Sequence, residues 1–285
     1  MERKNVGYEM VGALRQGDLL SWWKKNSPDT KSSYPWDLVC EYPDKKPDEM
    51  SGQIEAIGLS GSGKTEFLNF ASRSLDQNKI IIRPELVIAT PEGTTENWGE
   101  GENSRKMRGL MAVEFGIKHQ MLIWDQIKFI SHLQGDVEQV QTGKELLIER
   151  GTNDILCTDS FTRPEHYSIR YNRYFQNQWL ELIVTSIALA QRVDAVILFG
   201  TNYEETQKRR IAAGLEPEGK YINRVNWPEI MGGYEWWLGA FYPLFRKAQG
   251  MGLLILDGTS DLDLNNQKAL NFSKKVFEAR IGGSF

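Results

Sequence analysis

A glycine-rich octapeptide that follows a short apolar run constrains the fold of this chain most. Residues 58–65 read Gly-Leu-Ser-Gly-Ser-Gly-Lys-Thr, which matches the pattern G-x4-G-K-[ST] in full. The run Ile54–Ile57 before it predicts a buried strand, and residues 66–75 after it carry apolar side chains spaced for one face of a helix. A strand, a glycine turn and a helix in this order predict a phosphate-binding loop inside an α/β domain.

The glycines, the lysine and the threonine of this loop each suit the binding of phosphate and Mg²⁺. Glycines let the backbone wrap around phosphate oxygens with its N–H groups pointing inward, where a Cβ atom would collide. Lys64 is expected to be an exposed charge that reaches the β- and γ-phosphates, and the Thr65 hydroxyl is expected to ligate Mg²⁺. The sequence therefore predicts ATP and Mg²⁺ as the bound groups. The residues assigned to them are Gly58, Ser60, Gly61, Ser62, Gly63, Lys64 and Thr65.

Strands alternate with helices along the rest of the chain. Buried strands are predicted near residues 54, 81, 147, 196 and 254, and each reads as a continuous apolar run. Such runs separated by helices predict a five-stranded parallel sheet covered on both faces, a three-layer α/β domain over residues 52–285. Residues 1–51 are richer in Lys, Asp, Ser and Pro, and we treat them as an N-terminal extension.

Composition and charge narrow the classes of partner. The 285 residues carry a net charge of −4 and give a pI near 5.6, whereas a protein that works on nucleic acid usually has a basic face. No stretch approaches the ~20 apolar residues that span a bilayer, and the first residues lack the apolar block of a signal peptide. With only Cys40 and Cys157, no disulfide framework is indicated. We expect a cytoplasmic protein without a membrane partner; nucleic acid is not favoured, and a homodimer stays open.

Charged residues follow two of the predicted strands. Glu149 and Arg150 end the strand near residue 147, where side chains project into the ligand crevice of a parallel sheet. There the acid can hold the water ligands of Mg²⁺ and the guanidinium can bridge phosphate or the attacking hydroxyl; an ion pair at a strand end is the alternative. Glu85, after Arg83 and Pro84, can accept the proton of the attacking hydroxyl, or it is a solvated turn carboxylate.

Other classes of P-loop protein have signatures that this sequence lacks. GTPases carry Asn-Lys-x-Asp, which does not occur here, and none of the predicted strands ends in the Asp-Glu of helicase-type ATPases. The histidines show no metal-ligand spacing with the cysteines, so a zinc site is not expected. The remaining features favour a small-molecule kinase.

Four segments resemble deoxynucleoside kinases, in the order and near the spacing of that family. Ile82–Val87 looks like their Pro-Glu-Pro-Val segment, and Ile148–Gly151 looks like their Glu-Arg-Ser motif. Glu205–Ile211 resembles their lid helix, and Leu254–Asp257 resembles their final strand. The resemblance covers about residues 53–265 and implies the three-layer P-loop kinase fold with a helical lid.

The resemblance also implies roles for individual residues. Glu85 matches the general base, and Glu149 with Arg150 matches the pair that organises Mg²⁺ and phosphate. Gln120 stands nearest to the glutamine that reads the base of the acceptor, and Arg210 is the best match to a lid arginine that closes over the donor phosphates. The implied activity is transfer of the γ-phosphate of ATP to a hydroxyl of a nucleoside or deoxynucleoside.

Departures from the family leave other acceptors open. Gly151 replaces the usual Ser, and Asp154 beyond it is a competing candidate for the base. Thymidylate kinases share the fold; Pro91–Thr94 is similar to one of their loops, and Arg105 and Arg108 behind it would meet an acceptor phosphate. The alternatives are a nucleoside monophosphate kinase, a phage-type P-loop kinase acting on 5-hydroxymethyl pyrimidines in DNA, and a non-catalytic ATP binder.

Overall fold

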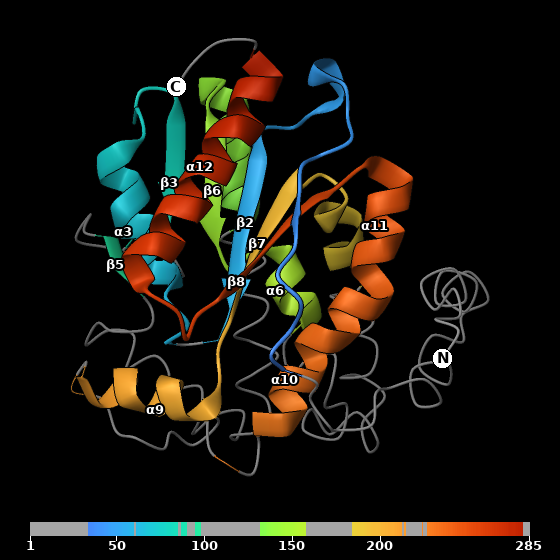
Figure 1. Cartoon of the computed structure of the whole chain (residues 1–285). Coiled ribbons are helices and arrows are strands. Elements are labelled where there is room, and N and C mark those ends of the chain that lie inside the picture. The colour runs from blue at the N-terminus through green and yellow to red at the C-terminus, as the bar shows by residue number, and fades with distance from the viewer. Residues whose placement is uncertain are drawn as a thin grey trace, which may run out of the picture.

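A six-stranded mixed sheet lies between two layers of helices in the computed structural model of the chain (Figure 1). The structure describes residues 34–59, 61–84, 87–89, 95–97, 132–157, 184–212, 214, 224 and 227–281. Within these ranges, no helix is both long enough and apolar enough to cross a membrane. The α/β class that the alternation of strands and helices predicts is confirmed.

The strands lie in the order β1-β8-β7-β2-β6-β3. Their bounds are β1 (Cys40–Glu41), β2 (Gln53–Gly58), β3 (Ile80–Arg83), β6 (Glu145–Glu149), β7 (Ala195–Gly200) and β8 (Gly252–Asp257). Neighbours pair in parallel from β3 to β8, whereas β1 pairs with β8 in the antiparallel direction. The sheet is therefore six-stranded and mixed, not five-stranded and parallel as predicted. A separate antiparallel ribbon joins β4 (Val87–Ala89) and β5 (Thr95–Asn97).

Helices cover both faces of the sheet (Figure 1). The helices on one face are α3 (Lys64–Ser74) and α12 (Leu262–Ile281). The other face carries α6 (Thr152–Cys157), α10 (Trp227–Trp236), the π-helical turn η3 (Trp237–Phe241) and α11 (Tyr242–Gln249). The remaining helical segments are the 3₁₀ turn η1 (Pro47–Glu49), residues 132–142 and 184–190, and α9 (Tyr203–Ala212), which lies beyond the ends of the strands.

Alternate residues of the central strand β2 point to opposite faces of the sheet. Ile54 lies in the apolar core under α3 and α12, and Ile57 lies in the core on the other face with Trp237. Full burial of such a side chain contributes about 1.5–3 kcal/mol. The same face as Ile57 also receives Gln53 and Glu55, both fully buried. One side of the sheet therefore encloses polar groups as well as apolar ones.

The described part of the N-terminal extension packs against the rest of the chain. Tyr34 donates its hydroxyl proton to Asp257 at 2.8 Å, at the end of β8. Lys45 forms an ion pair with Asp194 at 2.8 Å, just before β7. Together with the edge strand β1, these contacts join residues 34–51 to the sheet at both of its ends.

Candidate functional site

The loop between β2 and α3 has positive φ angles at three positions, and a glycine occupies each of them. Gly58, Gly61 and Gly63 have φ angles of 138°, 79° and 108°, in the region that side chains disfavour. At Gly58 lack of space adds a second requirement, because a Cβ atom there would lie 2.5 Å from the carbonyl oxygen of Phe199. The described residues of the octapeptide lie between β2 and α3, as the pattern predicts, and α3 begins at Lys64.

Two features of this loop suit an anion. No side chain caps the N-terminus of α3 at Gly63, so the first N–H groups of the helix lack that partner. The hydroxyl oxygen of Ser62 is buried and has no hydrogen-bond partner among the described residues. Helix N-termini carry partial positive charge and bind phosphate through such N–H groups. The loop therefore combines a buried hydroxyl that has no partner among the described residues with the favourable field of a helix N-terminus.

Lys64 lies differently from the exposed lysine that the sequence predicts. The residue is only 3% exposed, and Nζ donates a hydrogen bond to the carbonyl oxygen of Leu59 at 2.8 Å. A buried ammonium group needs such a partner, because burial removes its water. The prediction of an exposed charge is wrong, although the charge does lie against the backbone of the predicted loop.

The two predicted metal ligands lie in contact. The Thr65 hydroxyl donates to Oε1 of Glu149 at 2.9 Å. Thr65 opens α3 and is exposed, whereas Glu149 is buried at the end of β6, which pairs with β2. Among the described residues no group of three or more His, Cys, Asp or Glu side chains could hold a metal. Mg²⁺ commonly takes most of its ligands from phosphate and water, and needs only one or two protein groups such as these.

The chain turns sharply after β6. Arg150 has a φ of 55°, unusual for a residue with a side chain, and its N–H donates to the Ala56 carbonyl at 3.0 Å. On the other side of the turn, the Glu55 carboxylate accepts hydrogen bonds from Thr152 and Asn153. Sequence reasoning missed Glu55. Its signal was a charged residue inside the apolar run of a buried strand.

Asp154, the competing candidate for the base, is fully buried. Its Oδ1 accepts the hydroxyl proton of Tyr234 at 3.0 Å and lies 3.4 Å from the backbone nitrogen of Gly58. Burial raises the pKa of the Tyr234 hydroxyl, and the charge of Asp154 raises it further. Asp154 thus joins α6 to α10 and to the first residue of the loop.

An arginine next to the predicted one contacts the loop. Arg209 donates through Nη1 to the Gly61 carbonyl at 3.2 Å and through Nη2 to the Gly258 carbonyl. Its Nε is held by Glu205 one helical turn earlier, at 2.8 Å. Arg210 also lies on α9 and is partly exposed. The sequence analysis named Arg210, which stays a prediction, and it did not identify the contact of Arg209 with the loop.

The turn after β8 lies beside the same loop, because a Cβ on Gly258 would be 3.0 Å from the carbonyl oxygen of Ser62. Asp257 accepts hydrogen bonds there from Thr259, Ser260 and Tyr34. Partial burial by itself raises the pKa of the Asp257 carboxyl, but these hydrogen bonds outweigh it and hold the pKa below its usual value. Asp257 therefore stays ionised and orders this turn.

Five predicted site residues lie outside the described part of the chain, and their assignments stay predictions. They are Ser60, Glu85, Arg105, Arg108 and Gln120. No protein-family model matches the chain, and a search of curated proteins finds no match.

Proposed function

We propose that this protein is an ATP-dependent phosphotransferase that binds ATP·Mg²⁺ at the loop Gly58–Thr65. The observation that carries the proposal is the 2.9 Å contact between the Thr65 hydroxyl and the Glu149 carboxylate at the N-terminal end of α3. A hydroxyl and a carboxylate beside an uncapped helix N-terminus suit a divalent cation that bridges to phosphate. The two residues come from motifs 84 positions apart, so their contact is independent support.

The residues of the loop would divide the work of holding the donor. Backbone N–H groups and the Ser62 hydroxyl would bind phosphate oxygens, and Thr65 with Glu149 would hold Mg²⁺. The bound Mg²⁺ neutralises charge on the phosphate oxygens. Lys64 would exchange the Leu59 carbonyl for a phosphate oxygen and stabilise the charge that develops during transfer.

We propose a hydroxyl of a nucleoside or deoxynucleoside as the acceptor, with Glu85 as the general base. The acceptor oxygen bonds to the γ-phosphorus, the bond to the β–γ bridging oxygen breaks, and the hydroxyl proton passes to Glu85. Arg150 and Arg210 would neutralise phosphate charge from the strand end and from α9. This part is supported by the resemblance of Ile82–Val87 and Ile148–Gly151 to deoxynucleoside kinase segments.

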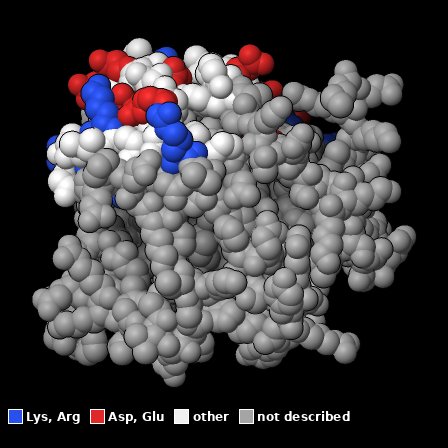
Figure 2. Space-filling view, turned by 90° about the horizontal axis from the view of Figure 1, so that it is seen from below, with Lys and Arg blue, Asp and Glu red and all other residues white. Residues whose placement is uncertain are grey.

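One surface bears on DNA as the alternative acceptor. Figure 2 views the molecule from the end where α9 lies, and its described part carries basic and acidic side chains next to one another. On α9, Lys208 and Arg209 lie 3.5 Å and 2.8 Å from carboxylate oxygens of Glu205. DNA binding relies on basic side chains that neutralise successive phosphates. The mixed charge of this surface favours a small acceptor.

A transfer assay with γ-labelled ATP tests the proposal. The acceptors are nucleosides, nucleoside monophosphates and duplex DNA that contains 5-hydroxymethyl pyrimidines, each with Mg²⁺ and with EDTA. We expect Mg²⁺-dependent label on a nucleoside. Label on a monophosphate or on DNA would replace the acceptor, and no label on any acceptor would contradict the phosphotransferase assignment.

The base assignment has its own test. Glu85→Gln keeps the shape of the side chain but cannot take the proton, so kcat should fall roughly 10²–10⁴-fold. The KM for ATP should stay nearly constant, because the base acts on the acceptor. Asp154→Asn is the matched control. Undiminished kcat in Glu85→Gln beside an inactive, folded Asp154→Asn would move the base to Asp154.

A further inference from the structure

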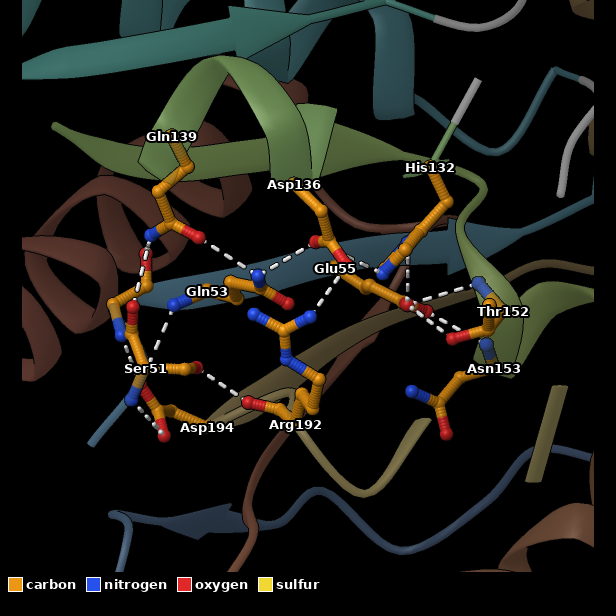
Figure 3. A network of polar contacts seen from close by, with 11 residues as sticks. Ser51, Gln53, Glu55, His132, Asp136, Gln139, Thr152, Asn153, Arg192 and Asp194 are labelled. Carbon is orange, nitrogen blue, oxygen red and sulfur yellow. Dashed lines mark hydrogen bonds and ion pairs between the residues drawn. The ribbon is translucent and has the colours of Figure 1, made fainter. Parts of the chain in front are cut away.

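A buried carboxylate holds the turn that follows two of the proposed donor-site residues (Figure 3). Glu55 is fully buried in β2, where a charge is costly unless it is partnered. Its Oε1 accepts hydrogen bonds from the N–H and the hydroxyl of Thr152, both at 2.9 Å, and Oε2 accepts one from the N–H of Asn153 at 2.8 Å. Three donors from two successive residues fix the start of α6 against the centre of the sheet.

The glycine before these donors is fitted to the carboxylate. A Cβ atom on Gly151 would lie 2.4 Å from Oε1 of Glu55 and 2.8 Å from Nδ1 of His132. Real Cβ atoms essentially never lie this close to another heavy atom. A larger residue at position 151 would therefore push the turn away from Glu55. The close contact therefore depends on Glu55 and Gly151 together.

A buried histidine links Glu55 to the helix that covers residues 132–142. His132 is fully buried, with Nδ1 3.4 Å from Oε1 of Glu55 and Nε2 3.6 Å from Oδ1 of Asp136. Asp136 in turn pairs with Arg192 at 3.0 Å (Figure 3). Burial raises the pKa of the Glu55 carboxyl, and His132 and the hydrogen bonds from the turn oppose that rise. The carboxylate is thus supported from both sides.

We propose that Glu55 is a positioning residue of the donor site, which sets the turn Gly151–Asn153 and thereby orients Glu149 and Arg150. The inference rests on the proposed function, because that function assigns Glu149 and Arg150 to ATP·Mg²⁺. Few residues separate Glu55 from the two donor-site residues that it would orient. Arg150 holds a φ of 55°, a strained conformation that persists only where its surroundings enforce it. The Ala56 carbonyl holds one side of this turn and Glu55 holds the other.

Glu145 offers the matched case of a buried carboxylate away from the turn. It lies at the start of β6, is 2% exposed, and pairs with Arg280 of α12. Glu55→Gln and Glu145→Gln therefore remove the same charge from adjacent strands, but only the first reaches Thr152 and Asn153. The pair separates a positioning role from a general loss of stability.

The test combines a local and a functional measurement on the full chain. In Glu55→Gln an NH₂ group replaces one acceptor oxygen, so the N–H groups of Thr152 and Asn153 cannot both be satisfied. Their amide hydrogen exchange should accelerate at least about tenfold. The affinity for a fluorescent ATP analogue in the presence of Mg²⁺ should fall about 10–100-fold, which is the usual loss when a residue that orients a metal ligand is removed. Glu145→Gln should change neither quantity.

Gly151→Ala disturbs the same contact by a change in the turn instead of in Glu55. It provides the test if Glu55→Gln does not fold. We expect the same loss of Mg²⁺-dependent affinity from its clash with Glu55. The double variant Glu55→Ala/Gly151→Ala should lose less affinity than the sum of the losses of the two single variants, because the clash with Glu55 is absent when Glu55 is truncated.

The outcomes separate this inference from the proposed function. Unchanged Mg²⁺-dependent affinity in a folded Glu55→Gln or Gly151→Ala protein, beside intact binding by the wild type, overturns the positioning role alone. A wild-type protein that does not bind ATP·Mg²⁺ overturns the proposed function and the positioning role with it. Faster exchange at Thr152 together with weaker Mg²⁺-dependent binding supports both.

Discussion

The two ends of the sheet bury charge in different ways. At the amino ends of the strands, the buried carboxylates of Asp194 and Glu145 are matched by cations and N–H groups from the chain itself. At the carboxyl ends, the structure gathers a glycine turn, an uncapped helix and the contact between Thr65 and Glu149. The hydroxyl of Ser62 at this end has no partner among the described residues.

Asp194 shows how the amino end is closed. Its carboxylate accepts N–H groups from Ser51, Gly52 and Gln53 at 3.1, 2.6 and 3.3 Å, and it pairs with Lys45. These contacts attach the start of β2 to the start of β7. A buried charge with this many partners is an element of the fold, and it leaves no lone pair to offer a ligand.

The comparison teaches that burial of charge does not by itself indicate a site. What sets the carboxyl end apart is a glycine turn that leads into a helix N-terminus without a side-chain cap, next to a buried hydroxyl that has no partner among the described residues. If this distinction is right, equivalent substitutions at the two ends should divide between activity and stability.

Two buried lysines make the largest expected contrast. Lys64→Met should lower kcat for phosphoryl transfer about 10³-fold, or about 4 kcal/mol, because it removes charge stabilisation beside the transferred group. Lys45→Met should leave kcat unchanged and lower the free energy of unfolding, because it deprives the buried Asp194 of its cation. Steady-state kinetics and urea denaturation of both variants provide the measurements. Equal losses of kcat in the two variants would contradict the assignment of activity to the carboxyl end and of stability to the amino end.

Asp194→Asn should give the next largest effect, on stability alone. The amide has only one acceptor oxygen, so it cannot accept from the N–H of Ser51 on one side and from those of Gly52 and Gln53 on the other. The charge opposite Lys45 is also lost. Breaking a buried pair by removing one partner costs about 3 kcal/mol or more. Urea denaturation should show this loss, while the affinity of the folded variant for an ATP analogue stays that of the wild type. A variant as stable as the wild type would contradict this account of the amino end.

The smallest effect concerns pH. Burial raises the pKa of the Glu145 carboxyl from 4.5 to about 7, although Arg280 opposes the rise. A raised carboxyl pKa means that the folded state binds the proton more tightly than the unfolded state, so stability falls as pH rises from about 4.5 to 7. The contribution is about 2 kcal/mol, because solvent screening reduces the roughly 3 kcal/mol that the full shift would allow.

Glu145→Gln removes this titration. The free energy of unfolding should therefore fall less between pH 4.5 and pH 7 in the variant than in the wild type. Parallel pH profiles for the two proteins would show that Glu145 does not titrate as described.

The sequence was informative where chemistry depends on a local pattern. The strand, glycine turn and helix around Gly58–Thr65 follow from an eight-residue motif, and the structure has them. The contact between Thr65 and Glu149 follows because the carboxyl ends of parallel strands meet at one edge. The sequence analysis assigned Thr65 and Glu149 to Mg²⁺ separately and did not predict their contact, but their placement at one edge needed only local pattern and the direction of the strands.

Features that depend on packing could not be predicted in this way. The edge strand Cys40–Glu41 has two residues, which is too short to show any periodicity. Arg209 and Arg210 are indistinguishable by motif, yet successive helix residues point about 100° apart, and Arg209 meets the Gly61 carbonyl. The contact of Glu55 with the turn after β6 joins positions 97 apart, and only the folded sheet reveals it.

Binding of ATP in the presence and absence of Mg²⁺ tests the central claim most directly. Titration calorimetry of the wild type and of Thr65→Val, which keeps the shape of the side chain without its hydroxyl, provides the comparison. The wild type should bind ATP at least about tenfold more tightly with Mg²⁺ than with EDTA, because the proposed magnesium site includes the contact of Thr65 with Glu149. Thr65→Val should lose this gain and keep the affinity measured in EDTA. Equal wild-type affinity with and without Mg²⁺, or an undiminished gain in Thr65→Val, would contradict the assignment of this loop as the donor site.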